Sequence, residues 1–277
     1  MKYENIKLDM DGAVQASLSL YIQEDYPATY GLRRRPIVLV CPGGGYEHVS
    51  VREGEPIALN FLTAGCHAAV LWYDISKDGV EYPQELLELA KAVSIIRKRA
   101  DELAIDKDKI ILAGFSAGGH LAASLGCFWN EEWLEKEMNI SRESYKPNGL
   151  ILAYPVITSG EYAHVGSFAN FMGEKASHEL EVKLSLEKQV TENVPPVFMW
   201  HTFEDGAVPL ENSLLFASAL RRAGINFEYH VFPHGGHGYA LATKETAAIP
   251  ERKEIDPQCE QWMELCKNWL KYNFIEK

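Results

Sequence analysis

An apolar run, a small-residue turn and a helical pattern follow one another in Ile110-Ile111-Leu112-Ala113-Gly114-Phe115-Ser116-Ala117-Gly118-Gly119-His120-Leu121-Ala122-Ala123. The centre of this stretch is a G-x-S-x-G pentapeptide, and its strand-turn-helix setting is that of a nucleophile elbow. Gly114 and Gly118 let neighbouring backbones approach closely, so we expect Ser116 to project its hydroxyl from a strained turn. The structural alternative is a serine that only caps the helix beginning near Ala117.

The same alternation of short apolar runs and helical periods continues along the chain and is typical of a mostly parallel sheet joined by helices. Strands are expected at 16–22, 37–41, 68–72, 110–114, 149–154, 197–201 and 226–232. Helices are expected at 53–64, 83–103, 117–128, 209–223 and about 258–272. The first strand precedes the helix-linked ones, so we expect it to pair antiparallel at the sheet edge. The fold class is α/β, as a single domain over residues 1–277.

Residues 157–193 interrupt this alternation with a polar, glycine-bearing stretch and one or two short helical patterns around 179–189. We expect a cap-like insertion over the carboxyl edge of the sheet. Such segments often form the wall or lid of a binding cleft, and a surface excursion without function is the alternative.

Composition narrows the class of protein. The 277 residues are 47% hydrophobic and 24% charged, and no apolar run approaches the ~20 residues that cross a bilayer. The first residues lack the apolar core and cleavage site of a secretory signal, so we expect a cytoplasmic protein without a membrane partner. The net charge of −12 disfavours nucleic acid and favours a neutral or cationic small molecule as partner.

The cysteines Cys41, Cys66, Cys127, Cys259 and Cys266 are odd in number, widely spaced and never arranged as C-x-x-C. This pattern argues against a disulfide framework and against a structural zinc site, so we expect buried, reduced thiols and no metal. A homo-oligomer is compatible with the sequence, but no heptad or apolar stripe locates an interface.

A serine nucleophile needs a base, and the base needs a carboxylate to orient it. Asp205 follows the strand expected at 197–201, and His237 lies between two glycines after the strand expected at 226–232. We expect Asp205 to orient His237 and His237 to deprotonate Ser116. The chain order Ser, Asp, His is that of α/β-hydrolases.

Each of these residues has an alternative. Glu204 could replace Asp205 as the carboxylate, although a shorter side chain holds an imidazole more rigidly. His234 competes with His237 as the base. We expect His201 to be a packed or hydrogen-bonded structural residue, and His120, one helical turn beyond Ser116, to pack within the sheet.

Acyl transfer also needs hydrogen-bond donors for the developing oxyanion. The strand expected at 37–41 runs into Pro42-Gly43-Gly44-Gly45-Tyr46, where an α/β-hydrolase carries an HGGG-type sequence. We expect the backbone N–H groups of Gly44, Gly45 and Ala117 to form the oxyanion hole. A phosphate loop is disfavoured because no G-x-G-x-x-G or Lys-Ser/Thr sequence follows.

In combination, these motifs resemble the α/β-hydrolase superfamily over nearly the whole chain. More narrowly, the glycine turn, the elbow through Ala122, Tyr154-Pro155-Val156 and His237-Gly238 look like bacterial acetyl esterases of the xylan esterase and lipase group. That resemblance implies deacetylation of sugars or oligosaccharides, such as acetylated xylo-oligosaccharides, by a Ser-Asp-His triad without a metal or organic cofactor. Two positions depart from the pattern: Pro42 replaces the histidine of HGGG, and the acidic Asp74 follows the strand at 68–72, where relatives commonly have a basic residue near the cleft mouth.

The expected function is therefore hydrolysis of short-chain acyl esters. Tyr46, Tyr154 and Tyr239 are candidates for aromatic faces that hold a sugar ring, although aromatic residues at strand ends are more often core. The alternatives are a small peptidase or other acyl hydrolase on the same fold, and a noncatalytic binding protein that retains it. Peptidases of this kind usually carry a propeller or large cap, for which this length leaves no room.

Overall fold

The computed structural model describes residues 1–24, 34–248 and 254–276. Its strands form one sheet in the order β1-β2-β4-β3-β5-β6-β7-β8. Their bounds are β1 (Lys2–Lys7), β2 (Ser17–Ile22), β3 (Arg35–Cys41), β4 (His67–Trp72), β5 (Ile105–Phe115), β6 (Gly149–Ala153), β7 (Val197–Thr202) and β8 (Phe227–Phe232). The six strands from β4 to β8 across the sheet are parallel, as the sequence predicts, and this is the α/β-hydrolase fold.

The expected position of the first strand was wrong. β2 pairs antiparallel with both β1 and β4, so β1 and not β2 is the edge strand. The residues of β1 alternate between exposed and half-buried, and this weak pattern left no apolar run to recognise. β5 also begins earlier than expected, because Arg35 pairs with Ile105 before a register shift leads into the regular ladder from Ile37.

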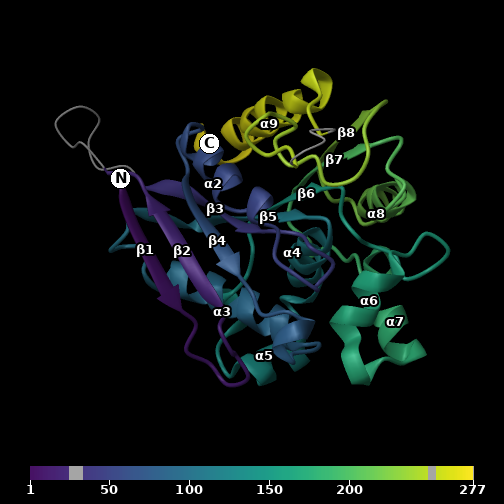
Figure 1. Ribbon diagram of the computed structural model, residues 1–277. Coiled ribbons are helices and arrows are strands. Elements are labelled where there is room, and N and C mark those ends of the chain that lie inside the picture. The colour runs from purple at the N-terminus through teal and green to yellow at the C-terminus, as the bar shows by residue number, and fades with distance from the viewer. Residues whose placement is uncertain (25–33, 249–253, 277) are drawn as a thin grey trace.

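Helices cover both faces of the sheet (Figure 1). Their bounds are α2 (Glu55–Leu62), α3 (Gln84–Lys98), α4 (Ala117–Phe128), α5 (Glu132–Met138), α6 (Val165–Met172), α7 (His178–Leu184), α8 (Glu211–Arg222) and α9 (Pro257–Leu270). Alternate residues of β3 point to opposite faces: Leu39 packs in the core formed with α3, α4 and α8, and Val40 in the core formed with α2 and α9.

The segment between β6 and β7 contains α6 and α7, which lie together below α8 in Figure 1. It is fixed to the body by buried contacts: Asn212 of α8 accepts the N–H groups of Ile157 and Thr158 at 2.9 and 3.0 Å. Farther along, Phe171 stacks on Tyr46 with ring centroids 4.3 Å apart. These contacts seat the insertion against the turn that follows β3.

Parallel strands bring their carboxyl ends to one edge of the sheet, where loops can combine residues from distant positions. The turn after β3 carries the glycines, Ser116 follows β5, Asp205 follows β7 and His237 follows β8. The topology therefore collects all of the predicted site residues at this edge.

Candidate active site

Ser116 occupies the sharp turn between β5 and α4. Its backbone has φ 53° and ψ −119°, a conformation that is strained for any residue other than glycine. The flanking glycines make the turn sterically feasible: a Cβ on Gly118 would lie 2.1 Å from the carbonyl oxygen of Cys41, and one on Gly114 would lie 2.3 Å from that of Gly118. The serine side chain is largely buried beneath the edge of the sheet.

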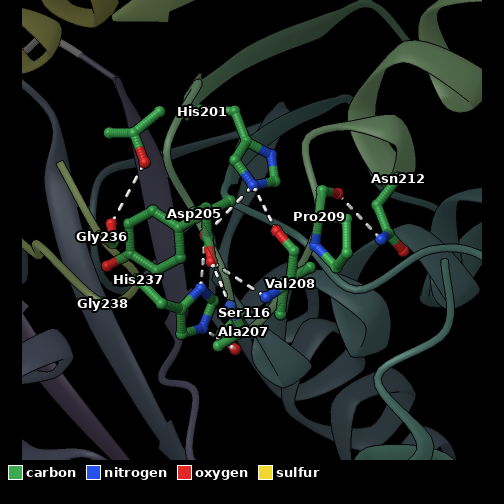
Figure 2. A network of polar contacts seen from close by, with 12 residues as sticks. Ser116, His201, Asp205, Ala207, Val208, Pro209, Asn212, Gly236, His237 and Gly238 are labelled. Carbon is green, nitrogen blue, oxygen red and sulfur yellow. Dashed lines mark hydrogen bonds and ion pairs between the residues drawn. The ribbon is translucent and has the colours of Figure 1, made fainter. Parts of the chain in front are cut away.

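His237 joins Ser116 to Asp205 (Figure 2). Its Nε2 lies 2.7 Å from Ser116 Oγ, and its Nδ1 lies 2.7 Å from Asp205 Oδ2. Since an ionised carboxylate only accepts, Nδ1 donates to Asp205 and the free Nε2 accepts the serine proton. The three predicted residues therefore form one continuous hydrogen-bonded chain, with His237 in the tautomer whose Nε2 can accept a proton from Ser116.

Both carboxylate oxygens of Asp205 accept hydrogen bonds. Oδ1 accepts the N–H groups of Ala207 and Val208 at 3.0 and 2.9 Å, and Oδ2 accepts from His201 as well as from His237. Burial alone would raise the pKa of Asp205, but the hydrogen bonds from the two histidines outweigh burial and lower it below its ordinary value. The carboxylate therefore stays ionised beside the imidazole.

The alternatives to Asp205 and His237 form a separate pair. Glu204 Oε1 lies 3.2 Å from His234 Nδ1, and both side chains are exposed. His201 is buried, as expected, and its Nε2 lies 2.9 Å from the carbonyl oxygen of Val208. Neither Glu204 nor His234 contacts Ser116 or His237 through a hydrogen bond in the described part of the chain.

His120 is buried but does not pack within the sheet as expected. Its Nδ1 lies 2.9 Å from Tyr46 Oη, and its Nε2 lies 2.9 Å from the carbonyl oxygen of Leu184 in α7. Burial, partly offset by the bond to Leu184, lowers the pKa of His120 to about 4. A neutral imidazole thus links α4 to the insertion.

The glycine turn after β3 lies directly against the serine. A Cβ on Gly43 would lie 2.9 Å from Ser116 Cβ, and Gly44 and Gly45 have φ values of +125° and +65°. Among the described residues, the N–H groups of Gly44 and Gly45 make no hydrogen bond. The N–H of Ala117 is the first of α4 and has no partner within the helix. These donors remain available to a developing oxyanion.

A cleft of about 350 Å³ opens over Ser116 and His237. It is lined by the glycine turn, the following segment, the loop after β8 and one residue of the insertion: Gly44, Gly45, Glu47, His48, Ser50, Arg52, Glu53, Ser116, His164, His237 and Gly238. The insertion therefore forms part of the cleft wall. It also holds the glycine turn, because Asn170 Nδ2 donates to the carbonyl oxygen of Gly45 at 2.9 Å.

His164 presents a polar atom to this cleft. Its Nδ1 accepts the N–H of Ser167 at 3.2 Å and lies 2.8 Å from Ser167 Oγ. Burial and the neighbouring His237 lower the pKa of His164, so the ring is neutral and its proton lies on Nε2. No local sequence pattern marks His164, Arg52 or Glu53, because each joins the cleft only through the packing of distant segments.

The aromatic faces expected from three tyrosines are not on the cleft. Tyr46, Tyr154 and Tyr239 are at most 8% exposed, and none of them lines the cleft. Tyr46 is covered by Phe171, and Tyr154 by Trp200 and His237. The prediction that these rings contact a substrate was wrong, because all three are buried away from the cleft.

With this geometry in place, similarity to known proteins fixes the family. Residues 26–220 match the BD-FAE family model. The chain belongs to the BD-FAE family. This BD-FAE member is 42% identical over 214 residues to endo-1,4-beta-xylanase B of Butyrivibrio fibrisolvens, a match that covers 76% of the chain and 34% of that protein. It is 27% identical to an acetylxylan esterase of Xylanibacter ruminicola, with 74% of the chain and 41% of that protein covered. The chain thus spans only 34% and 41% of the length of these two relatives.

Solved structures resemble the BD-FAE member over almost its full length. The carboxylesterase Cest-2923 from Lactobacillus plantarum superposes with a TM-score of 0.88 at 29% identity, covering 99% of this chain and 98% of the other. An acetyl ester-xyloside bifunctional hydrolase from Caldicellulosiruptor lactoaceticus gives a TM-score of 0.81 at 34% identity, with 97% and 92% covered. The chain therefore groups with carboxylesterases of the α/β-hydrolase fold.

The described part of this BD-FAE member contains neither a candidate metal site nor a candidate membrane-spanning helix. Within 1–24, 34–248 and 254–276, no cluster of three or more His, Cys, Asp or Glu side chains has the geometry to hold a metal ion. In the same ranges, no helix is both long and apolar enough to span a membrane. The five cysteines are all free and buried.

Proposed function

We propose that this chain is a serine esterase that removes short acyl groups, chiefly acetyl, from carbohydrate esters such as acetylated xylo-oligosaccharides. One observation carries the proposal: Ser116, His237 and Asp205 form an unbroken hydrogen-bonded chain whose serine end opens into a cleft lined by glycine backbone. Base, nucleophile and oxyanion donors are the parts that acyl transfer needs.

The reaction follows from these positions. His237 Nε2 takes the proton of Ser116 as Oγ attacks the ester carbonyl, and the resulting oxyanion accepts hydrogen bonds from Gly44, Gly45 and Ala117. Collapse of the tetrahedral intermediate breaks the bond to the alcohol, which leaves with the proton from His237. Water, deprotonated by His237, then attacks the acyl-enzyme and releases the carboxylic acid. Asp205 stabilises the imidazolium in both halves of the reaction.

The substrate class rests on cleft size and on the relatives. A cleft of about 350 Å³ is at the small end of the range for ligand sites, which favours a short acyl group. Its lining is rich in polar groups, including the imidazoles of His48 and His164 and the guanidinium of Arg52. Such a surface suits an alcohol part with several hydroxyl groups, as in a sugar, better than it suits a long acyl chain. The names of the xylan-related proteins above support a carbohydrate ester.

Acetate release tests this proposal. The protein is incubated with acetylated xylo-oligosaccharides, 4-nitrophenyl acetate and 4-nitrophenyl butyrate, with Ser116→Ala as the control. We expect acetate from the oligosaccharides and a loss of about 10⁴-fold or more in turnover for Ser116→Ala. Turnover of the activated esters alone would retain the serine mechanism and reject the carbohydrate substrate. A folded, fully active Ser116→Ala variant would reject the mechanism itself.

A further inference from the structure

Glu53 is a buried carboxylate directly beneath the glycine turn. It ends the short helix η1 (Val51–Glu53) and is 3% exposed. Its Oε2 accepts the N–H of Gly43 at 2.9 Å, and its Oε1 accepts the hydroxyl of Tyr154 at 2.7 Å. A carboxylate is costly to bury, and it persists where hydrogen bonds satisfy its oxygens. Each oxygen of Glu53 thus holds a different segment of the site.

Tyr154 continues the connection toward the base. It follows β6, is 1% exposed and has φ 38°. Besides donating to Glu53, its hydroxyl accepts the N–H of Ala240 at 2.9 Å. Its ring also packs edge-on against His237, with centroids 5.0 Å apart. One side chain therefore touches the segment that carries His237 both through its hydroxyl and through its ring.

Arg52 makes a parallel connection from the same short helix. Its Nη2 donates to the carbonyl oxygen of Gly238 at 2.6 Å. Arg52 and Glu53 thus tie η1 to the loop after β8, Arg52 directly and Glu53 through Tyr154. The resulting path runs from Gly43 N–H through Glu53 and Tyr154 to Ala240 N–H. It joins the turn after β3 to the loop after β8, which lie far apart along the chain.

We infer that Glu53 and Tyr154 are positioning residues that fix the glycine turn relative to the loop carrying His237. The inference rests on the proposed function, because it concerns the turn that stabilises the oxyanion and the loop that supplies the base. Both must act on one tetrahedral carbon, and misplacement of about 1 Å can cost about 100-fold in rate. The path supplies this alignment because both side chains are buried, with Glu53 at the wall of the cleft and Tyr154 outside its lining.

Tyr154→Phe is the direct test. It keeps the ring against His237 and Trp200 and removes only the hydroxyl that joins Glu53 to Ala240. We expect kcat for 4-nitrophenyl acetate to fall about tenfold or more, with KM nearly unchanged. The affinity of a short alkyl boronic acid, which forms a tetrahedral adduct with the serine, should fall by a similar factor because the adduct uses the same alignment.

Tyr145→Phe is the matched control. Tyr145 is fully buried, and its hydroxyl has no hydrogen-bond partner in the described part of the chain. Loss of that hydroxyl should leave kcat and boronic acid affinity within twofold of the wild type. The comparison separates the role of the Tyr154 hydroxyl from the general effect of a buried Tyr→Phe change.

A second variant tests the path as a unit. Glu53→Gln keeps an oxygen that can accept from Gly43 but loses the second acceptor, which binds the Tyr154 hydroxyl. If the two residues act through each other, the double variant should lose no more kcat than the worse single variant. If one single variant folds poorly, the other still tests the inference, since Tyr154→Phe and Glu53→Gln each remove the same contact.

The outcomes separate this inference from the proposed function. Retained activity in Ser116→Ala rejects the proposed function. Loss of activity in Ser116→Ala together with a Tyr154→Phe variant that matches Tyr145→Phe in kcat and boronic acid affinity rejects only the positioning role. Multiplied losses in the double variant also reject it, because independent residues do not form one path.

Discussion

The two carboxylate oxygens of Asp205 make different kinds of contact. Oδ1 closes the turn after β7 by accepting two backbone N–H groups, while Oδ2 receives His201 and His237. The turn fixes the position of the carboxylate, so in the proposed reaction His237 needs no reorganisation to take up the serine proton. Glu204, one residue earlier, contacts the exposed His234 and accepts the N–H of Gly235 at 3.2 Å, and neither contact reaches His237.

Exchange of the Asp205 carboxylate for an amide tests its assignment as the group that orients His237. Asp205→Asn keeps the shape of the side chain but removes the charge and favours the wrong tautomer of His237, so we expect kcat to fall by about 10³ to 10⁴-fold. Steady-state kinetics on 4-nitrophenyl acetate measure the loss. Glu204→Gln is the matched control and should stay within a few-fold of the wild type. Equal losses in both variants would contradict the assignment.

At the scale of elements, the site depends on how closely α4 approaches the end of β3. Gly118 in the first turn of α4 leaves no room for a side chain, since a Cβ there would lie 2.1 Å from the oxygen of Cys41 and 2.3 Å from that of Pro42. These backbone oxygens cannot move aside for a new Cβ as the end of a flexible side chain can. The elbow and the glycine turn are therefore one packed unit built from two strands.

Gly118→Ala should separate the two turns. We expect a destabilised protein, by about 1–3 kcal/mol as for other overpacked sites, and a loss of activity well beyond the fraction unfolded. Urea unfolding and kinetics on the folded protein measure the two effects. Gly206→Ala is the control, because a Cβ there meets nothing within 4 Å. A stable, fully active Gly118→Ala variant would be inconsistent with this packing.

His120 makes the contact between α4 and the insertion sensitive to acid. The pKa of His120 is lowered to about 4 in the folded protein, against about 6.5 in the unfolded chain. As the pH falls, the unfolded chain therefore takes up this proton before the folded protein does. Its contribution to stability is present above pH 6.5 and disappears as the pH falls through 4, a change of about 3 kcal/mol.

The variant His120→Gln can still reach the hydroxyl of Tyr46 and the carbonyl of Leu184, but it does not titrate. We therefore expect its free energy of unfolding to fall less than that of the wild type between pH 7 and pH 4.5, as measured by urea unfolding at each pH. Parallel curves for the two proteins would show that His120 is not the group responsible.

Elsewhere in the molecule, a buried group of acids gives stability a pH dependence opposite to that from His120. Asp74, Glu85 and Glu88 lie together in the core near the start of α3. Asp74 accepts the N–H groups of Val14 and Gln15 at 2.6 and 2.9 Å, so it anchors the segment before β2 and does not face the cleft mouth as the sequence suggested. Both oxygens of Glu85 lack a hydrogen-bond partner among the described residues.

Glu85→Met should stabilise the protein mainly at alkaline pH. Burial raises the pKa of Glu85 to about 8, so the folded protein holds a proton that the unfolded chain has released above about pH 4.5. The stability from this group is complete below pH 4.5 and is lost as the pH rises through 8. The gain of the Met variant over the wild type should therefore grow between pH 5 and pH 8.5. A gain independent of pH, measured by thermal unfolding, would contradict the ionisation.

The sequence predicted the parts of this molecule that depend on neighbours along the chain. Ser116, Asp205 and His237 each follow a strand at its carboxyl end, so a parallel sheet must gather them. Contacts that do not follow from the order of the strands could not be predicted. Glu53 meets Tyr154 across 101 positions. The tyrosines were misassigned because whether a ring is covered depends on the insertion and on other strands.

In the proposed reaction Ser116 carries the acyl group, and trapping of the acyl-enzyme tests this step. The protein is mixed with 4-nitrophenyl acetate, quenched in acid within milliseconds, and digested for peptide mass spectrometry. We expect one acetyl group on the peptide containing Ser116, and none in Ser116→Ala. Acetyl on another residue with turnover intact, or turnover by Ser116→Ala, would show that Ser116 is not the nucleophile.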